Sequence, residues 1–250
     1  MKIFGLIAVL VIGVLLLSAT NDFPSWGDPR SAASDGEVSS FYIEQTKNVT
    51  KVPNMVTAVL ADFRGYDTMF ETVVIFIAGI GIIAVLRNFD EVHSSSVQRD
   101  RNDEGSGLLA RVTCSLILPF IQIFALYVVA HGHHSPGGGF QGGVMLGASY
   151  ILLALAFGLS KAKGYFSERR TMIFAAVGIF IYAGWGVLCL LFGKEFLNYS
   201  VLDSLLPGDA EMARSHSMLI VEIGVAFTVT AIMFSMYSNL STRGRLNKGL

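Results

Sequence analysis

Six apolar runs, each near the length needed to cross a lipid bilayer, constrain this chain more than any other feature. A membrane-spanning helix needs ~20 mainly apolar residues, and only helices and closed barrels satisfy their own backbone hydrogen bonds in lipid. The sequence therefore predicts an all-α integral membrane protein with about six transmembrane helices. The expected helices are Ile3–Ser18, Met69–Leu86, Leu108–Ala130, Val144–Leu159, Met172–Phe192 and Met218–Tyr237.

Composition narrows the class of function. Of the 250 residues, 52% are hydrophobic and 15% are charged, whereas soluble domains carry about 25% charged residues. The net charge of −1 offers no basic surface for nucleic acid. The sequence has no nucleophile elbow or P-loop, and no strand–turn–helix unit to host a dinucleotide. We therefore expect a membrane protein whose partners include the lipid bilayer. It is not expected to be an enzyme itself or to hold a cofactor.

The distribution of Lys and Arg predicts the orientation of the helices. If the N-terminus lies inside, 12 of the 18 Lys and Arg residues fall on the inner side of the membrane and 6 on the outer side. Cytoplasmic loops carry the excess of positive charge. The expected location is the cell membrane, as a multi-pass protein with both termini in the cytoplasm.

Two polar segments divide the apolar runs. The segment Asn21–Asn54 contains prolines and glycines and is expected to be an external linker. The segment Asn88–Gly107 is charged and Ser-rich, which is typical of a flexible connection. These segments predict a two-helix unit over residues 1–90, a cytoplasmic linker over 91–107 and a four-helix domain over 108–250.

The segment Gly132–Gly143, GHHSPGGGFQGG, lies directly between two of the apolar runs. Each Gly in a helix costs roughly 1 kcal/mol relative to Ala, so this segment is either an ordinary surface turn or a break in a transmembrane path. Its central motif residues are Pro136, Gly137, Gly138, Gly139, Phe140 and Gln141.

An ionisable residue inside a span is a candidate for function because burying its charge is costly. Glu222 lies between Val221 and Ile223, about one turn inside the last predicted helix. It is either an ion-path group or a side chain that extends to the membrane interface. Gln122, in the third helix, is expected to bond to a neighbouring helix.

A second polar group, ADFRGYDTMFET over Ala61–Thr72, begins the second helix. Asp67 and Glu71 are four residues apart and share one helical face. They either favour the helix dipole as first-turn acids or form a carboxylate pair that holds a proton or a hydrated Na⁺, with Thr68 adding an oxygen ligand. Asp62 is expected to pair with Arg64 and to act structurally.

Three histidines, His131, His133 and His134, flank the glycines. Imidazole titrates near pH 6.5, so these residues are candidates for accepting protons; the alternative is plain loop structure. A metal site is not predicted, because no Cys or carboxylate lies near them in the sequence.

The segment Gly132–Gly158 and the supporting segment LIVEIGVAFTV, Leu219–Val229, resemble the MnhB/MrpB family, the B subunit of the Mrp-type Na⁺/H⁺ antiporter. That family also tends to place an acidic residue at the position of Glu222. The earlier segment Ala61–Val74 resembles the final part of the large A subunit of that antiporter and a small subunit of membrane-bound hydrogenases. These resemblances imply Na⁺ and H⁺ as the transported ions and other membrane subunits as partners.

Three functions follow as alternatives. The first is a membrane subunit of a multisubunit cation/H⁺ antiporter module that contributes to the ion path and to assembly. The second is the same module within a redox-driven ion pump such as a membrane-bound hydrogenase, and the third is a purely structural scaffold. The ion-path candidates are Asp67, Thr68, Glu71, Glu222, His131, His133 and His134.

Overall fold

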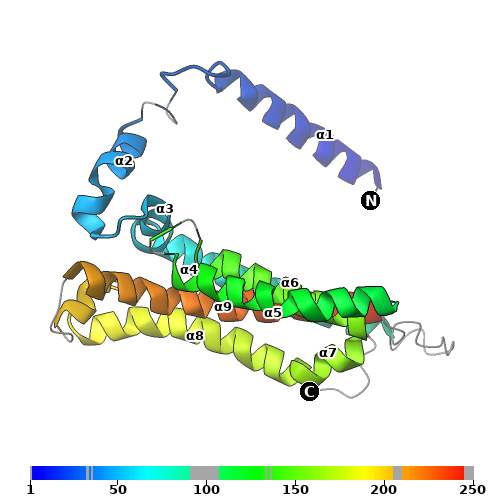
Figure 1. Cartoon of the computed structure of the whole chain (residues 1–250). Helices are drawn as coiled ribbons and strands as arrows, with labels where there is room; N and C mark the ends of the chain where they lie inside the picture. The colour runs from blue at the N-terminus through cyan, green and yellow to red at the C-terminus, as the bar shows by residue number, and fades with distance from the viewer. Residues whose placement is uncertain are drawn as a thin grey trace. The chain divides into compact units, whose positions relative to one another are not determined.

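The structure is a computed structural model that describes residues 2–31, 34, 36–90, 107–132, 134–135, 137–204 and 210–244. Every regular element within these residues is helical (Figure 1). In chain order the elements are α1 (Lys2–Ala19), η1 (Thr20–Asp22), α2 (Glu37–Thr50), α3 (Met55–Thr57), η2 (Ala58–Phe63), α4 (Gly65–Asp90), α5 (Leu108–Ala130), α6 (Gly139–Phe157), α7 (Leu159–Tyr165), α8 (Glu168–Leu191), η3 (Tyr199–Ser204) and α9 (Ala210–Thr242).

Six of these segments are long and apolar enough to cross a membrane, which confirms the predicted fold class. They are Ile3–Asp22, Gly65–Arg87, Leu108–Ala130, Gly139–Phe157, Glu168–Leu191 and Met212–Thr242. Two helices begin well before their predicted starts: α6 at Gly139 instead of Val144, and α9 at Ala210 instead of Met218. Hydropathy marks only the apolar part of a helix, so it misses glycine-rich and polar ends.

Contacts divide the chain into two units, Met1–Gln45 and Thr46–Leu250, and each is described by itself. In the first unit, α1 supplies the candidate span Ile3–Asp22, and the first unit itself buries none of this window. The predicted linker Asn21–Asn54 contains the helix α2, a difference that follows from the absence of Gly and Pro between residues 37 and 50. Residues 91–106 of the predicted cytoplasmic linker lie outside the described residues, so the division at that linker stays a prediction.

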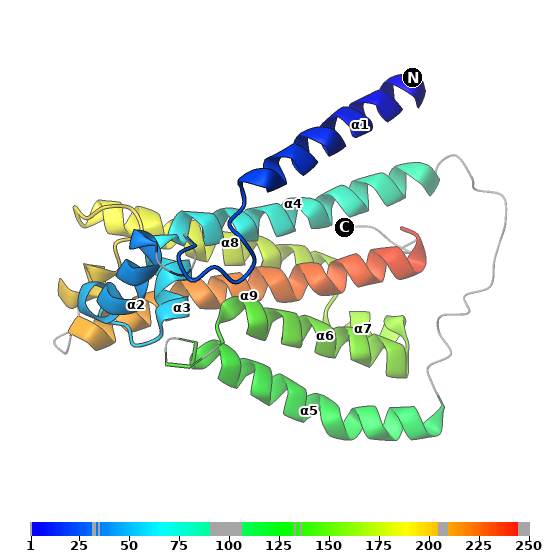
Figure 2. The same ribbon diagram turned by 90° about the horizontal axis from the view of Figure 1, so that it is seen from above.

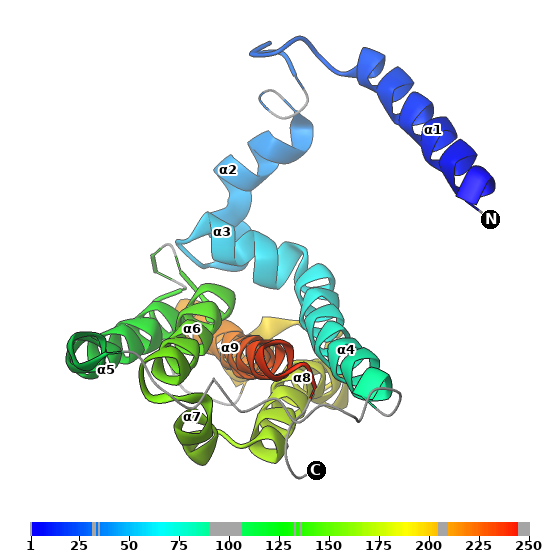
Figure 3. The same ribbon diagram turned by 90° about the vertical axis from the view of Figure 1, so that its right-hand side faces the viewer.

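The second unit is built around α9. This helix packs against α8, α6 and α4, and Figures 2 and 3 show it surrounded by these helices. Of its spanning window, 67% is buried, compared with at most 33% for any other candidate span. Most of the spanning part of α9 therefore lies inside the protein, whereas much of α4 and α5 is exposed at the surface of this chain.

Close packing at the α8–α9 crossing depends on small residues. A Cβ added at Gly224 would lie 2.7 Å from the carbonyl oxygen of Gly178. Next to this crossing, the Thr228 hydroxyl donates to the Ala175 carbonyl at 2.9 Å. Lipid supplies no hydrophobic drive for helix association, so close backbone packing and interhelical hydrogen bonds stabilise the bundle instead.

Candidate functional site

Glu222 is a carboxylate buried within the central helix. It lies 12 residues after Ala210, the first residue of α9, which is about 18 Å along a helix that rises ~1.5 Å per residue. Only 8% of the residue is exposed. Its Oε2 has no hydrogen-bond partner within the described part of the chain. The helix begins about two turns before the start predicted from the sequence, and Glu222 lies correspondingly further from its first residue.

The glycine segment encloses this carboxylate. Gly138, just before α6, has a φ of 126°, which favours Gly strongly over residues with a Cβ. A Cβ added at Gly138 would lie 3.0 Å from Glu222 Oε1, and one added at Gly132 would lie 2.7 Å from Oε2. At Gly139 a Cβ would overlap the backbone carbonyl of Glu222 itself. The glycines therefore allow the backbone to approach where side chains would displace the carboxylate.

Two polar residues before η2 hold the loop in place. Asn54 Nδ2 donates to the carbonyl oxygens of Gly132 and Ser135, at 2.7 Å in each case. The Thr57 hydroxyl donates to the same Gly132 oxygen at 2.5 Å. These contacts fix the loop between α5 and α6 against a segment about 75 residues away in the chain.

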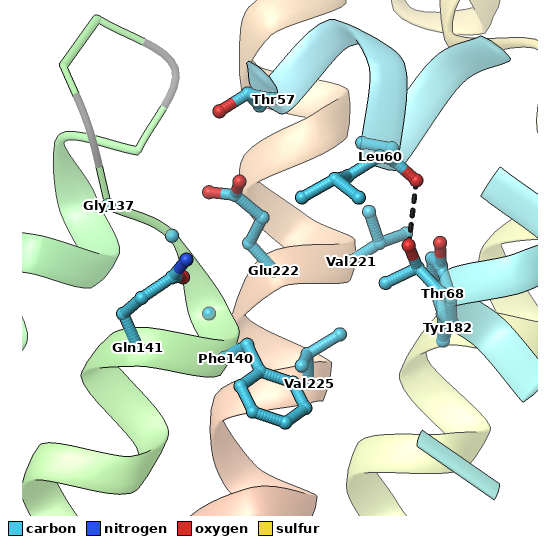
Figure 4. A pocket seen from close by; sticks show the side chains of 13 residues that line it. Thr57, Leu60, Thr68, Gly137, Phe140, Gln141, Tyr182, Val221, Glu222 and Val225 are labelled. Atoms are coloured by element: carbon cyan, nitrogen blue, oxygen red, sulfur yellow. Dashed lines mark hydrogen bonds between the residues drawn. The ribbon is translucent and has the colours of Figure 1, made fainter. Parts of the chain in front are cut away.

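The Glu222 side chain faces a small cavity, shown in Figure 4. The cavity has a volume of about 50 Å³, and one water needs ~10–15 Å³, so there is room for a few waters. Its walls come from η2, α4, α6, α8 and α9, and the lining residues are Thr57, Leu60, Ala61, Thr68, Gly137, Gly138, Gly139, Phe140, Gln141, Tyr182, Val221, Glu222 and Val225. We call this space the glutamate cavity.

Most of the lining of the glutamate cavity is apolar, and its polar groups are one carboxylate and a few neutral oxygens. The Thr68 hydroxyl donates to the Leu60 carbonyl at 2.8 Å, so its oxygen remains able to accept. The carboxylate also lies beside the first turn of α6, whose partial positive charge stabilises an anion. Such a site can hold a proton on the carboxyl group, or a small cation beside its charged form.

An ion pair lies on the other side of η2. Arg214 Nε and Nη2 donate to Asp62 Oδ2 at 2.9 and 2.5 Å, and both side chains are mostly buried. The predicted pairing of Asp62 with Arg64 is wrong, since Arg64 instead binds Asp67 at 2.5 Å. Burial raises the pKa of Asp62, and the Arg214 charge opposes that rise.

The sequence from α5 to α9 matches a known family. A family model described as a domain related to the MnhB subunit of the Na⁺/H⁺ antiporter matches residues 109–235. This range covers just over half of the chain and includes both the glycine segment and Glu222.

The chain belongs to this family.

The part before the MnhB-related domain matches a second model, MbhE, described as the E subunit of MBH, over residues 30–103. This match falls on the segment for which the second resemblance was predicted. Both resemblances drawn from the sequence are therefore confirmed.

Some individual proteins match most of this chain and not only its MnhB-related domain. A probable K⁺/H⁺ antiporter A/B subunit of Rhizobium meliloti (strain 1021) is 24% identical over 210 residues, covering 75% of this chain and 20% of that protein. A chain in the structure of the membrane-bound sulfane sulfur reductase (MBS), an archaeal respiratory membrane complex, has a TM-score of 0.68 at 25% identity, covering 96% of this chain and 97% of its own. A chain in the structure of the Mrp complex from Dietzia sp. DQ12-45-1b has a TM-score of 0.70 at 21% identity, covering 99% of this chain and 26% of its own. The chain thus spans about a fifth of the Rhizobium protein and about a quarter of the Dietzia chain.

The structure brings some of the predicted residues together at the MnhB-related domain. Thr68 and Glu222 share the glutamate cavity with Gly137, Gly138, Gly139, Phe140 and Gln141. Asp67 is exposed and paired with Arg64, and Glu71 is exposed on α4 outside the cavity lining. Glu71 is therefore not part of the lining of the glutamate cavity in this chain, and its place in the ion path stays a prediction.

Two of the three predicted histidines are described by the structure and lie at the surface of the MnhB-related domain. His131 and His134 are both exposed, and the His131 ring stacks on Tyr127 with a centroid separation of 4.0 Å. His133 and Pro136 lie outside the described residues. The described residues contain no group of three His, Cys, Asp or Glu residues that could hold a metal ion.

Several contributors to the site escaped sequence reasoning. Asn54, Thr57, Tyr182 and Arg214 are ordinary polar residues near the ends of helices or in a span. The signal that could have found them is polarity within or beside an apolar run, the same signal that identifies Glu222 and Gln122. Gln122 does bond to a neighbouring helix as expected, donating to the Ser149 hydroxyl of α6 at 3.2 Å.

Proposed function

We propose that this chain is a membrane subunit of a multisubunit antiporter module that exchanges a cation such as Na⁺ for H⁺, and that Glu222 is part of its ion path. The single observation that supports this role most strongly is the buried Glu222 carboxylate beside a cavity with room for water. The described residues supply no hydrogen-bond partner to its Oε2, and a buried carboxylate in a membrane protein is costly to keep. A function that uses the charge or the proton of the Glu222 carboxyl group explains why a buried carboxylate is present at this position.

The partners in this proposal are other membrane subunits of the same complex. Large apolar side chains on α4 and α5, including Phe70, Val74, Leu116 and Phe120, are more than half exposed, and neighbouring helices or lipid would cover them. The chain supplies no redox centre and no catalytic group in this proposal, so it acts as a transporter subunit. It lies in the cell membrane with both termini in the cytoplasm, as the Lys and Arg distribution predicts.

A second candidate is the same module inside a redox-driven ion pump. The observation that favours it is the match over 96% of this chain and 97% of the matched chain in the respiratory membrane complex. In the antiporter relative, in contrast, the matched region is only a fifth of that protein's length. Purification of the intact complex separates the two candidates, because iron–sulfur or other redox subunits would accompany the chain only in the second.

Replacement of Glu222 by Gln tests the ion-path role. The side chain keeps its shape and loses its charge and its exchangeable proton. We expect Na⁺-driven proton movement in everted vesicles to fall to the level of vesicles that lack the complex, while native gels show full assembly. The matched control is Glu44→Gln, which makes the same change at an exposed position of α2. Unchanged transport and unchanged apparent Na⁺ affinity in the Glu222 variant would favour the scaffold function instead.

A further inference from the structure

A second, larger cavity lies next to the glutamate cavity. It has a volume of about 260 Å³ and is lined by Asp62, Gly65, Tyr66, Glu195, Phe196, Leu197, Asn198 and Arg214. We call it the arginine cavity. Its edge reaches the surface, since Tyr66 is 52% exposed and Glu195 is exposed. Hydrogen bonding from Asn198 lowers the pKa of Glu195, so the edge carries a negative charge at neutral pH.

One wall separates the two cavities. Tyr182 lines the glutamate cavity, and its hydroxyl donates to the Gly65 carbonyl at 2.8 Å. Gly65 in turn lines the arginine cavity. One hydrogen bond therefore joins the linings of the two cavities at this point.

A buried hydroxyl without a partner lies in the same wall. Tyr199 is 0% exposed, and its hydroxyl oxygen has no hydrogen-bond partner within the described residues. A Cβ added at Gly65 would lie 3.8 Å from the Tyr199 hydroxyl and 3.9 Å from the Tyr182 hydroxyl. Both hydroxyls therefore face the same small space over Gly65. Buried polar groups are nearly always hydrogen-bonded, to water where no protein group is available.

We infer that the arginine cavity is the entrance through which H⁺ or a small cation reaches Glu222, and that the hydroxyls of Tyr199 and Tyr182 carry it through the wall over Gly65. The inference rests on the proposed function of Glu222. The order of polar groups is Glu195 at the edge, the Asp62–Arg214 pair, Tyr199, Tyr182, Thr68 and then Glu222. Thr68 and Tyr182 lie side by side in the glutamate cavity (Figure 4). Burial raises the pKa of Tyr199 well above its usual range, so its hydroxyl stays protonated and able to donate.

The chemistry of the walls favours this entrance over a lateral one. The glutamate cavity also approaches the surface between Leu60 and Phe140, which are 44% and 40% exposed. These apolar side chains offer no ligand to a cation that leaves water. The route over Gly65 offers the hydroxyl oxygens of Tyr199, Tyr182 and Thr68, and the Glu195 carboxylate at the edge of the arginine cavity attracts cations.

Accessibility of a cysteine at position 222 tests the route without relying on transport. The complex would carry Glu222→Cys with Cys114 and Cys189 replaced by Ala, and Ag⁺ would be added in chloride-free buffer to vesicles of each orientation. Free thiol remaining is then counted with a fluorescent maleimide after denaturation. We expect Ag⁺ to reach the thiol from one side only. Adding Gly65→Ala, which places a methyl group between the two hydroxyls, should slow the reaction several-fold.

A second substitution guards against a misfolded Gly65 variant. Tyr199→Phe removes only the unpartnered hydroxyl and should also slow the Ag⁺ reaction, whereas the matched control Tyr165→Phe changes an exposed tyrosine and should not. If neither Gly65→Ala nor Tyr199→Phe alters the rate, or if Leu60→Trp slows it instead, the entrance is lateral and the inference is wrong. This result is independent of the proposed function, because Glu222→Gln can abolish transport whichever route the ion takes.

Discussion

At the scale of single residues, polarity inside an apolar run identified Glu222 but not its surroundings. The sequence shows that a carboxylate lies within a span, since the residues on both sides of Glu222 form a long apolar run. It does not show that Gly132 and Gly138 approach both carboxylate oxygens, because that contact joins residues more than 80 positions apart.

The partner of Asp62 was missed for a related reason. Arg64 is two residues away in the sequence, and Arg214 is 152 residues away. The π-helix η2 turns Asp62 toward α9 and leaves Arg64 facing outward, where it binds Asp67. Local spacing therefore favoured the wrong ion pair.

The Asp62–Arg214 pair should stabilise the fold, because both side chains are mostly buried. Arg214→Gln leaves a mostly buried carboxylate without its counter-charge, which should cost up to ~3 kcal/mol, the low end for a broken buried pair. The melting temperature of the detergent-solubilised complex should fall accordingly. A double variant, Asp62→Leu with Arg214→Met, removes both charges and should recover most of the loss; no recovery would contradict the pairing.

The same variant has a pH dependence with a definite sign. In wild type, burial raises the pKa of Asp62 and Arg214 opposes the rise. Without Arg214 only burial remains, so the folded-state pKa lies above the unfolded-state value. The penalty of the buried charge is then present at high pH and is relieved as the pH falls through the folded-state pKa. The melting deficit of Arg214→Gln should therefore be smaller at mildly acidic pH than at pH 8, and an equal deficit at both would argue against it.

At the scale of elements, the six spans could be predicted because lipid imposes length and hydropathy on each helix. The ends could not, and the glycine segment shows why. Gly139, Gly142 and Gly143 belong to α6, although Gly is unfavourable in isolated helices. These glycines instead allow α6 to pack closely against other helices, since a Cβ at Gly143 would lie 3.0 Å from the α9 backbone at Ala226.

Gly139→Ala tests the contact between α6 and α9. The added Cβ would overlap the Glu222 carbonyl, so α6 must move away from α9, and we expect loss of assembled complex on native gels. The control is Gly164→Ala on α7, where an added Cβ meets nothing within 4 Å. That variant should assemble as wild type does, or slightly better given the higher helix propensity of Ala. Normal assembly of Gly139→Ala would contradict the close approach of the two helices.

At the scale of the whole molecule, the family resemblance could be found because its motifs are continuous segments of the sequence. The glycine segment and the Leu219–Val229 segment both lie in the MnhB-related match. The cavity they help to form depends on η2 and α4, which belong to the range matched by the other model. The two segments that match different family models therefore both line the cavity beside the Glu222 carboxylate. Neither segment alone contains all the residues of that cavity.

The orientation of the chain in the membrane is a further prediction, and it concerns all six spans. With both termini in the cytoplasm, residues between the first two spans lie outside. Ser34 is exposed in this segment, so a Ser34→Cys variant in intact cells should react with a membrane-impermeant maleimide. A reaction that appears only after permeabilisation would reverse the proposed orientation.

The most direct measurement of the ion-path role of Glu222 is the protonation state of its carboxyl group during ion exchange. Infrared difference spectra of the purified complex, recorded as Na⁺ replaces a non-transported cation, report carboxyl groups that lose or gain a proton. We expect a protonated-carboxyl band in wild type that disappears when Na⁺ is added and that is absent in Glu222→Gln. Identical difference spectra from wild type and Glu222→Gln would show that this carboxylate does not exchange H⁺ for a cation.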